Sequence, residues 1–388
     1  FIIMFSVISS GMVAVMTQNI GAGRPGVAYQ ARQLGLTFNA VLGIIISLIL
    51  TFGAGAILAG VGVADALMQP ARTYLQIVGG FCILNALIPI CSSYLRAFGF
   101  SKEPLYASII GNVINFCLNA FFLFVLHKGV AGVATATVIS RIINLVIVVL
   151  LGAVLVKAKQ HPERESNRAV MGQIIRIGLP SACETAIYNV SMTLVIRFLN
   201  QMDAQGLNVT ARSYTMQITN FSYCVGAALA QANAIMTGWH IGAKEYDACD
   251  RGTKKAAVIG VIVAVILETV FTLCSGWIMQ LFSKDPQMVS LVGKLLAIDI
   301  VLEIGRVTNL VYGQALKTSG DAVFPVVMGV CFMILCSVGG TYLFGIRLGL
   351  LAVGAYIGMA GDECVRAIGM YLRWKSGKWK EKGLIKSR

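Results

Sequence analysis

The chain has 388 residues, of which 57% are hydrophobic and only 12% are charged, and its formal net charge is +14. So little polar surface excludes a water-soluble globular protein of this size and indicates an integral membrane protein. The apolar segments have the length of helices rather than of barrel strands, so we expect an all-α membrane protein. The positive charge suits lipid headgroups, whereas nucleic-acid binding is not expected because the chain has no basic folded domain for it.

Eleven apolar segments follow one another along the chain, each long enough to cross about 30 Å of hydrocarbon at about 1.5 Å per residue. They lie near 1–20, 38–62, 73–95, 104–126, 130–156, 174–200, 211–238, 256–282, 287–315, 322–346 and 349–372. The longest polar stretch, 157–176, separates two sets of segments. We therefore expect an N-terminal lobe over 1–156, a cytoplasmic linker over 157–176, a C-terminal lobe over 177–373 and a basic cytoplasmic tail over 374–388.

Two short patterns recur 221 positions later in the chain. Ile-Gly-Ala at 20–22 returns at 241–243, and Leu-Arg-Ala-Phe-Gly at 95–99 returns as Leu-Lys-Thr-Ser-Gly at 316–320. The common shift indicates a duplicated unit, which in an apolar chain is typical of transporters. Gly-Leu-Pro at 178–180 is expected to open the first helix of the second copy, with proline where a helix tolerates it best. Its counterpart would lie before residue 1, so we expect two six-helix lobes of which eleven helices are present here.

Lysine and arginine predict the orientation. Alternate loops, together with the tail, carry 21 of the 31 basic residues, and the opposite loops carry only Arg72, Lys128, Arg212, Lys284 and Arg347. The positive-inside rule then places the C-terminus in the cytoplasm and gives both halves the same orientation, with a pseudo-two-fold axis along the membrane normal. The expected location is the cytoplasmic membrane. Trp374 and Trp379, among basic residues, look like an interfacial anchor on anionic lipid.

A series of motifs resembles the multidrug and toxic compound extrusion (MATE) family over essentially the whole chain. The matching residues are Gln18-Asn19-Ile20-Gly21-Ala22-Gly23, Tyr94-Leu95-Arg96-Ala97-Phe98-Gly99, Asn115, Asn119, Gly132-Val133-Ala134-Thr135-Ala136-Thr137, Gly178-Leu179-Pro180, Gly242-Ala243, Ala315-Leu316-Lys317 and Gly320-Asp321. The resemblance implies two lobes around a central cavity and alternating access. It also implies export of amphipathic, often cationic small molecules against influx of Na⁺ or H⁺, with no other cofactor. We expect the protein to act as a monomer.

Ionisable groups inside the spans are the candidates for ion coupling, because each costs at least about 2.5 kcal/mol at the bilayer centre. Six carboxylates qualify, all in the second half: Glu184, Glu268, Asp299, Glu303, Asp362 and Glu363. Helical spacing puts Glu303 beside Arg306 and Glu363 beside Arg366. We predict a cluster in the cytoplasmic half of the membrane that binds the coupling ion or the substrate. Its members are Glu184, Glu303, Arg306, Asp362, Glu363 and Arg366.

The two glutamate–arginine pairs could instead be neutralised ion pairs that fix helix register. Glu184 has no basic residue within a turn on its own helix and is the better candidate for coupling, including a Na⁺ ion at its carboxylate. In the well-known members of the resembled family, however, the acidic residue of this helix comes a turn later, near Tyr188. Their acidic residue in the tenth helix falls near Arg306, where a guanidinium offers no ligand to Na⁺. No firm metal site is therefore predicted, and residues 303–309 resemble a less studied bacterial branch.

Polar side chains on other helices are candidates for lining a substrate cavity. They are Asn112, Asn115, Asn119 and Arg141 in the first half, and Tyr188, Asn189, Gln217, Asn220 and Tyr223 in the second. The three asparagines of the first half share one helix face, where their amides can bind substrate or hydrogen-bond to neighbouring helices. Arg141 could pair with a carboxylate of the first helix of this lobe, which is expected to lie before residue 1. Such groups among methionines and aromatic residues suit a cavity for amphiphiles, or are plain packing.

Three classes of function fit a chain of this kind to different degrees. A secondary drug exporter is favoured. The alternative is a flippase or exporter of a lipid-linked or metabolite substrate, which would need several arginines in the cavity, and only four arginines fall within the spans. A membrane-embedded enzyme is not expected, because the chain has no HExxH or GxSxG motif and its three histidines fall in loops.

Overall fold

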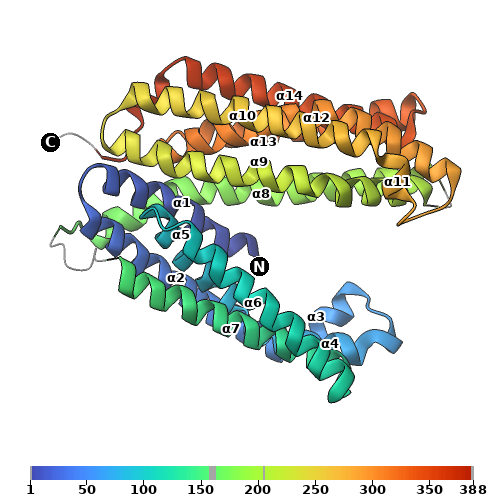
Figure 1. Cartoon of the computed structure of the whole chain (residues 1–388), viewed down its shortest axis with the longest axis horizontal. Helices are drawn as coiled ribbons and strands as arrows, with labels where there is room; N and C mark the ends of the chain where they lie inside the picture. The colour runs from blue at the N-terminus through green and yellow to red at the C-terminus, as the bar shows by residue number, and fades with distance from the viewer. Residues whose placement is uncertain (1, 157–162, 204–205, 386–388) are drawn as a thin grey trace. The chain divides into compact units, whose positions relative to one another are not determined.

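The computed structural model is helical throughout the residues it describes, 2–156, 163–203 and 206–385, apart from short connecting turns (Figure 1). It divides into two compact units, Phe1–Leu179 and Pro180–Arg388. The division falls inside the long helix α8 (Asn167–Met202). The all-α class predicted from the sequence is confirmed.

The first unit is built around helix α2. Its elements are α1 (Ile2–Gly21), α2 (Pro25–Phe52), α3 (Ala54–Val61), α4 (Asp65–Gly80), α5 (Ile83–Ala97), α6 (Lys102–Ala120), the π-helix η1 (Phe121–Val125), α7 (Gly129–Leu155) and the start of α8. Helix α2 packs against α1, α4 and α5, and α7 packs against α4, α5 and α6. Phe5, Ile46, Leu50 and Ala86 form a buried apolar core between α1, α2 and α5.

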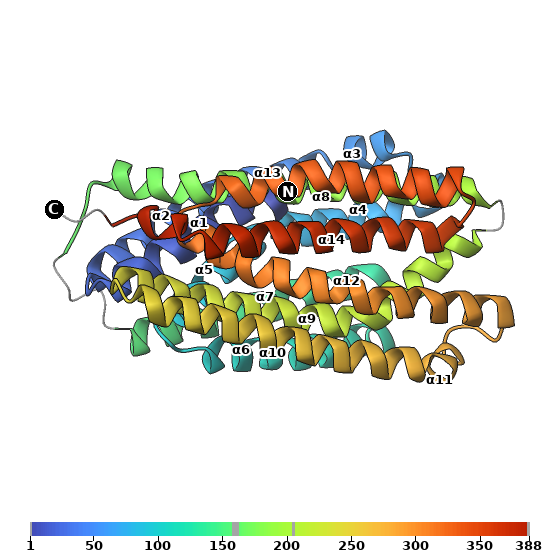
Figure 2. The same ribbon diagram turned by 90° about the horizontal axis from the view of Figure 1, so that it is seen from above.

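The second unit is built around helix α12. Besides the rest of α8 it contains α9 (Leu207–Gly242), α10 (Tyr246–Leu273), α11 (Ser275–Met279), α12 (Pro286–Thr318), α13 (Val323–Phe332), the π-helices η3 (Met333–Val338) and η4 (Thr341–Arg347), α14 (Leu351–Lys375) and the 3₁₀ turn η5 (Lys378–Glu381). Helix α12 contacts α9, α10, α11, α13 and α14. Seen from above, α12 and α14 run side by side along the unit (Figure 2).

The repeat of 221 residues is visible in the helix bounds. The shift carries α2 onto α10 at both ends, the last residue of α5 onto the last of α12, and the first residue of α6 onto the first of α13. After the same shift, the residues of the π-helix η1 fall within those of η4. Backbone conformation repeats as well, since Gly99 and Gly320 have φ of 89° and 96°, and Gly23 and Lys244 have φ of 72° and 61°. The duplication therefore extends from the sequence to local structure.

Helices occupy all eleven predicted spans in the described residues. Five of them, α2, α6 with η1, α7, α10 and α13 with η3 and η4, are long and apolar enough to cross a membrane, and the pair α4–α5, bent by 42°, would make a sixth. In the second unit α8, α9, α12 and α14 do not meet this criterion, because polar and charged side chains interrupt their apolar sequence. These same four helices enclose the polar cavity of that unit.

The start of α8 differs from the expected linker. Residues 157–162 lie outside the described residues, but Glu165 is held by Gln30 of α2, whose Nε2 donates to the Glu165 carbonyl at 2.7 Å and to Asn167 Oδ1 at 2.6 Å. Helix α8 begins at Asn167, so the expectation that Pro180 opens a helix is wrong. Pro180 lies inside α8, where it removes one backbone hydrogen bond, a defect that membrane helices tolerate.

The two tryptophans near the C-terminus are not a lipid anchor. The rings of Trp374 and Trp379 stack at 4.1 Å and are buried. Trp374 Nε1 donates to Asp250 Oδ1 at 2.9 Å, and Trp379 Nε1 donates to the Trp374 carbonyl at 2.9 Å. The expected interfacial role is therefore wrong, because indole N–H groups that are satisfied inside the protein fix the end of α14 against α10. Residues 386–388 of the expected tail lie outside the described residues.

Candidate functional site

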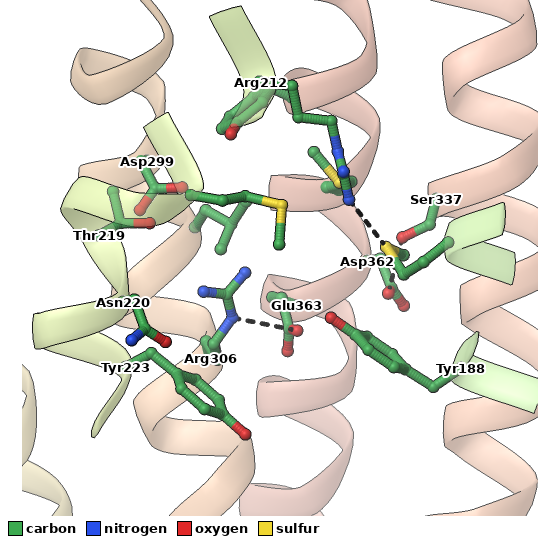
Figure 3. A pocket seen from close by; sticks show the side chains of 15 residues that line it. Tyr188, Arg212, Thr219, Asn220, Tyr223, Asp299, Arg306, Ser337, Asp362 and Glu363 are labelled. Carbon is green, nitrogen blue, oxygen red and sulfur yellow. Dashed lines mark hydrogen bonds and ion pairs between the residues drawn. The ribbon is translucent and has the colours of Figure 1, made fainter. Parts of the chain in front are cut away.

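A polar cavity of about 230 Å³ lies within the second unit, between α8, α9, α12, η3 and α14 (Figure 3). A second cavity of about 380 Å³ adjoins it. The two share Tyr188, Tyr223, Arg306 and Glu363 in their walls. Together they give this unit a polar interior that reaches across four helices.

Five of the six predicted cluster residues contact one another, and four of these five line the cavities. Arg306 pairs with Glu303 one turn earlier on α12, and its Nε lies 3.6 Å from Glu363 Oε1 on α14. Arg366 Nη2 lies 2.9 Å from the same Glu363 oxygen. Arg366 also donates to both oxygens of Asp362, at 2.9 and 3.0 Å. Glu363 thus joins the two pairs expected from helical spacing into one charge network across α12 and α14.

Gly305 brings these two helices together. A Cβ atom at this position would lie 2.7 Å from Cys364 N and 2.8 Å from the carbonyl carbon of Glu363. The backbones of α12 and α14 therefore touch, as small residues permit in membrane helices. On another face of α14, Gly354 and Gly358 make equally close approaches to the backbones of η4 and η3. These glycine contacts set how closely α14 packs against α12, η3 and η4, and so they position the charge network.

Neutral side chains complete part of the network. Ser337 of η3 donates its hydroxyl to Asp362 Oδ2 at 2.9 Å, and Asn309 Nδ2 donates to Glu363 Oε2 at 3.0 Å. Figure 3 shows Ser337, Asp362 and Glu363 on one side of the cavity, with Arg306 entering from α12. The carboxylates of α14 are therefore fixed in orientation as well as in position.

Glu184, the sixth predicted member, makes a different contact. Its Oε2 lies 2.6 Å from Nζ of Lys317, which is on α12, and it lines the second cavity. The close approach of α13 here depends on Gly329, where a Cβ atom would lie 3.1 Å from Glu184 Oε1. The sequence placed no basic residue near Glu184 on its own helix, and the partner comes from a helix far along the chain.

Some buried carboxylate oxygens in and beside the network have no hydrogen-bond partner. Among the described residues, one oxygen each of Asp299 and Glu303, and both oxygens of Glu268, have no hydrogen-bond partner. Glu268 of α10 has 0% of its surface exposed and lies within electrostatic range of the other two. The Ser222 hydroxyl is a polar neighbour of this carboxylate. Buried polar atoms without partners are costly, so these oxygens are ready acceptors for a proton or a cation.

The predicted cavity residues of the second half are only partly placed at the cavities. Tyr188 lines both, Asn189 lines the second, and Asn220 and Tyr223 also reach them. Gln217 is exposed and lines neither of these two cavities, so its place in a substrate cavity stays a prediction. The cavity face of α9 repeats at the helical spacing of 212, 216, 219, 220 and 223, and position 217 is turned away from it.

In the first unit the predicted amides hold helices together. Asn115 Nδ2 donates to Ser140 Oγ of α7 at 3.3 Å, and Asn119 Nδ2 donates to Asn115 Oδ1 at 3.0 Å. Asn112 is exposed. These contacts match the packing alternative of the two that the sequence left open. Arg141 makes no ion pair with any described residue, so its pairing with another helix stays a prediction.

Sequence reasoning missed Arg212, which it counted among loop residues. The structure places it inside α9, 6% exposed, in the wall of the first cavity. The signal was present, because Arg212 lies on the same helical face as Met216, Thr219 and Tyr223. A guanidinium at this depth does not count as a loop charge in the prediction of orientation.

Comparison with known proteins identifies the family. A family model described as MatE matches residues 1–121 and 180–343, well over half of the chain. The chain belongs to the MatE family. The resemblance inferred from the motifs is thereby confirmed. As a MATE transporter, the protein is a multi-pass membrane protein of a family that transports small molecules.

Curated relatives of this MATE transporter span most of its length. It is 33% identical over 389 residues to "Uncharacterized transporter YisQ" of Bacillus subtilis (strain 168), covering 99% of this chain and 85% of that protein. It is 21% identical over 328 residues to "Probable multidrug resistance protein NorM" of Thermotoga maritima, covering 81% of this chain and 68% of the relative.

Solved MATE structures share the fold of this transporter. A MATE protein in the straight conformation matches with a TM-score of 0.86 and 19% identity, covering 98% of this chain and 86% of that chain. An outward-facing multidrug resistance MATE family transporter of the MOP superfamily matches with a TM-score of 0.84 and 18% identity, covering 100% and 86%. At this level of identity the likeness shows the fold alone.

Proposed function

We propose that this MATE transporter is a secondary active exporter of amphipathic small molecules, driven by influx of Na⁺ or H⁺ through alternating access. The cavities of the second unit bind the coupling ion and the substrate. We place the protein in the cytoplasmic membrane with its C-terminus in the cytoplasm, because the charge asymmetry between loops favours that orientation.

The observation that carries the proposal is an excess of buried carboxylates beside the cavities. In and around the cavities of the described second unit, six carboxylates, Glu184, Glu268, Asp299, Glu303, Asp362 and Glu363, outnumber the four cations Arg212, Arg306, Lys317 and Arg366. Full ionisation would leave net negative charge in a region of low dielectric, where each unneutralised charge costs several kcal/mol. Binding a proton or a cation removes that cost, and the oxygens without hydrogen-bond partners are where it would bind.

The same walls suit an amphipathic substrate. Tyr188 and Tyr223 provide aromatic faces, and Met192 and Met216 provide flexible thioethers. A cationic substrate and the coupling ion would compete for the same carboxylates, which is the condition for exchanging one for the other. The relative named a probable multidrug resistance protein supports this substrate class.

A lipid-linked precursor fits the cavity less well. Such a substrate would need several free arginines, but Arg306 and Arg366 are neutralised by the glutamates and the aspartate of the network. Only Arg212 of the cavity arginines lacks a carboxylate partner among the described residues. The pairing of the other two favours a small amphiphile.

Transport in vesicles tests the proposal. Purified protein is reconstituted, and movement of the cationic dye rhodamine 123 is followed under an imposed Na⁺ gradient and, separately, an imposed pH gradient. We expect one gradient to drive the dye and Glu303→Gln to abolish that transport, whereas Glu381→Gln, an exposed carboxylate in the C-terminal 3₁₀ turn, leaves it unchanged. Dye movement that ignores both gradients, or that survives Glu303→Gln, would refute coupling at this site.

A further inference from the structure

Arg212 holds a positive charge in the cavity wall that the described protein does not neutralise. Its Nη2 lies 3.7 Å from the Met192 sulfur, a weak acceptor, and its Nε has no hydrogen-bond partner. No carboxylate of the described residues comes within ion-pair distance of it. At 6% exposure, this guanidinium is almost fully removed from solvent.

The neighbouring arginines show how unusual this arrangement is. Arg306 contacts Glu303 and Glu363, and Arg366 contacts Asp362 and Glu363. An arginine cannot escape burial by losing its proton, so an unpaired one keeps the full cost of desolvation. Because the fold pairs two of these arginines and leaves Arg212 facing a cavity without a carboxylate, an anion that binds Arg212 would offset its cost of desolvation.

Arg212 lies apart from Tyr223 and from the ion pair of Arg306 with Glu363. Figure 3 shows Arg212 entering from α9 at the end of the cavity away from Tyr223, with Arg306 and Glu363 between them. The planar fork of a guanidinium matches a carboxylate, sulfonate or phosphate through two parallel hydrogen bonds. One cavity therefore offers a guanidinium for an anion as well as aromatic rings and carboxylates.

We infer that Arg212 is an anion subsite, and that the substrates of this transporter include amphipathic acids and zwitterions with a carboxylate or similar group on an aromatic body. The inference rests on the proposed function, because it takes the cavity as the substrate site. It changes the expected substrate class, which the family resemblance describes as often cationic. The carboxylate of such a substrate binds Arg212, and its aromatic body packs against Tyr188, Met192 and Met216.

A matched pair of dyes tests the subsite on the purified full chain. Rhodamine 110 carries a free carboxylate, and rhodamine 123 is its methyl ester, so the two differ only in the group that Arg212 would bind. Their dissociation constants are measured by fluorescence polarisation in detergent. We expect the unmodified protein to bind rhodamine 110 about tenfold or more tightly than rhodamine 123, since hydrogen bonds to charged groups are stronger than neutral ones.

Two variants and a control separate binding from folding. Arg212→Gln should weaken rhodamine 110 binding about tenfold or more while changing rhodamine 123 binding less than about twofold, and Arg212→Lys should keep part of the preference. Arg197→Gln, an exposed arginine of α8 outside both cavities, should change neither dye. If Arg212→Gln does not fold, the dye comparison on the unmodified protein and on Arg212→Lys decides.

Three results would overturn the inference: equal affinity of the unmodified protein for the two dyes, binding of neither dye, or equal loss of both in Arg212→Gln, which is the mark of a structural role. Failure of the exporter function is distinguishable from these. In that case the carboxylate preference and its dependence on Arg212 are found in solution, while neither dye moves in vesicles under a Na⁺ or pH gradient.

Discussion

Replacing Gly305 by alanine adds one methyl group where α12 and α14 touch. The new Cβ would lie 2.7 Å from Cys364 N, whereas ordinary contact begins at 3.4 Å, so the helices must separate by about 0.7 Å. That movement would carry the contact between Arg306 and Glu363, already 3.6 Å, beyond ion-pair distance. Overpacking of this kind costs about 1–3 kcal/mol of unfolding free energy. We expect Gly305→Ala to be destabilised by that amount and to lose transport.

Gly361→Ala is the matched control on α14. A Cβ atom there meets nothing within 4 Å, so alanine should be neutral or should stabilise the helix by up to about 1 kcal/mol. Unfolding of both variants is measured in mixed detergent micelles, with the buried pair Trp374 and Trp379 as the fluorescence reporter, and transport is measured in vesicles. If Gly305→Ala is as stable and as active as Gly361→Ala, the close contact does not position the charge network.

The remaining predictions concern charge pairs and backbone strain. Glu303→Gln and Arg306→Gln should each lower the free energy of unfolding by about 3–5 kcal/mol, and the double variant should lose less than the sum of the two single losses. Strict additivity in unfolding titrations would rule out the pairing. Glu184→Gln should abolish drug resistance in cells at unchanged expression, and unchanged resistance would remove it from the mechanism. Gly99→Ala should lower the free energy of unfolding by about 1–2 kcal/mol, because alanine is strained at the left-handed φ of this position. Gly320→Ala should lower it further, because its Cβ would also lie 2.3 Å from a backbone carbonyl oxygen. Equal melting temperatures of the two variants would contradict this.

The repeat carried most of what the sequence predicted about the fold. Turn motifs are local, so a shift read from 20–22 and 95–99 also fixes where helices begin and end in both copies. The i,i+3 pairs of Glu303 with Arg306 and Glu363 with Arg366 were predictable for the same reason, since helical geometry alone places them. Their joining through Glu363 depends on the contact at Gly305, which spacing along one helix does not reveal.

Contacts between distant segments are what the sequence did not predict. Glu184 of α8 pairs with Lys317 of α12, and Trp374 donates a hydrogen bond to Asp250 instead of facing lipid. Arg212 was interpreted through a charge rule that assumes basic residues near helix ends face water, and its burial in the cavity wall reverses that interpretation. In each case the partner is set by helix packing, which single-helix periodicity leaves open.

Competition between the dye and the coupling ion tests the central claim most directly. The dissociation constant of rhodamine 123 is measured on the purified protein as Na⁺ is varied at constant pH, and as pH is varied at constant Na⁺. If substrate and ion share the buried carboxylates, the dissociation constant of the dye should rise in proportion to the concentration of one of the two ions, once that ion saturates its site. Glu303→Gln should flatten this dependence. A constant that responds to neither ion, or that responds equally in the variant, would contradict the account.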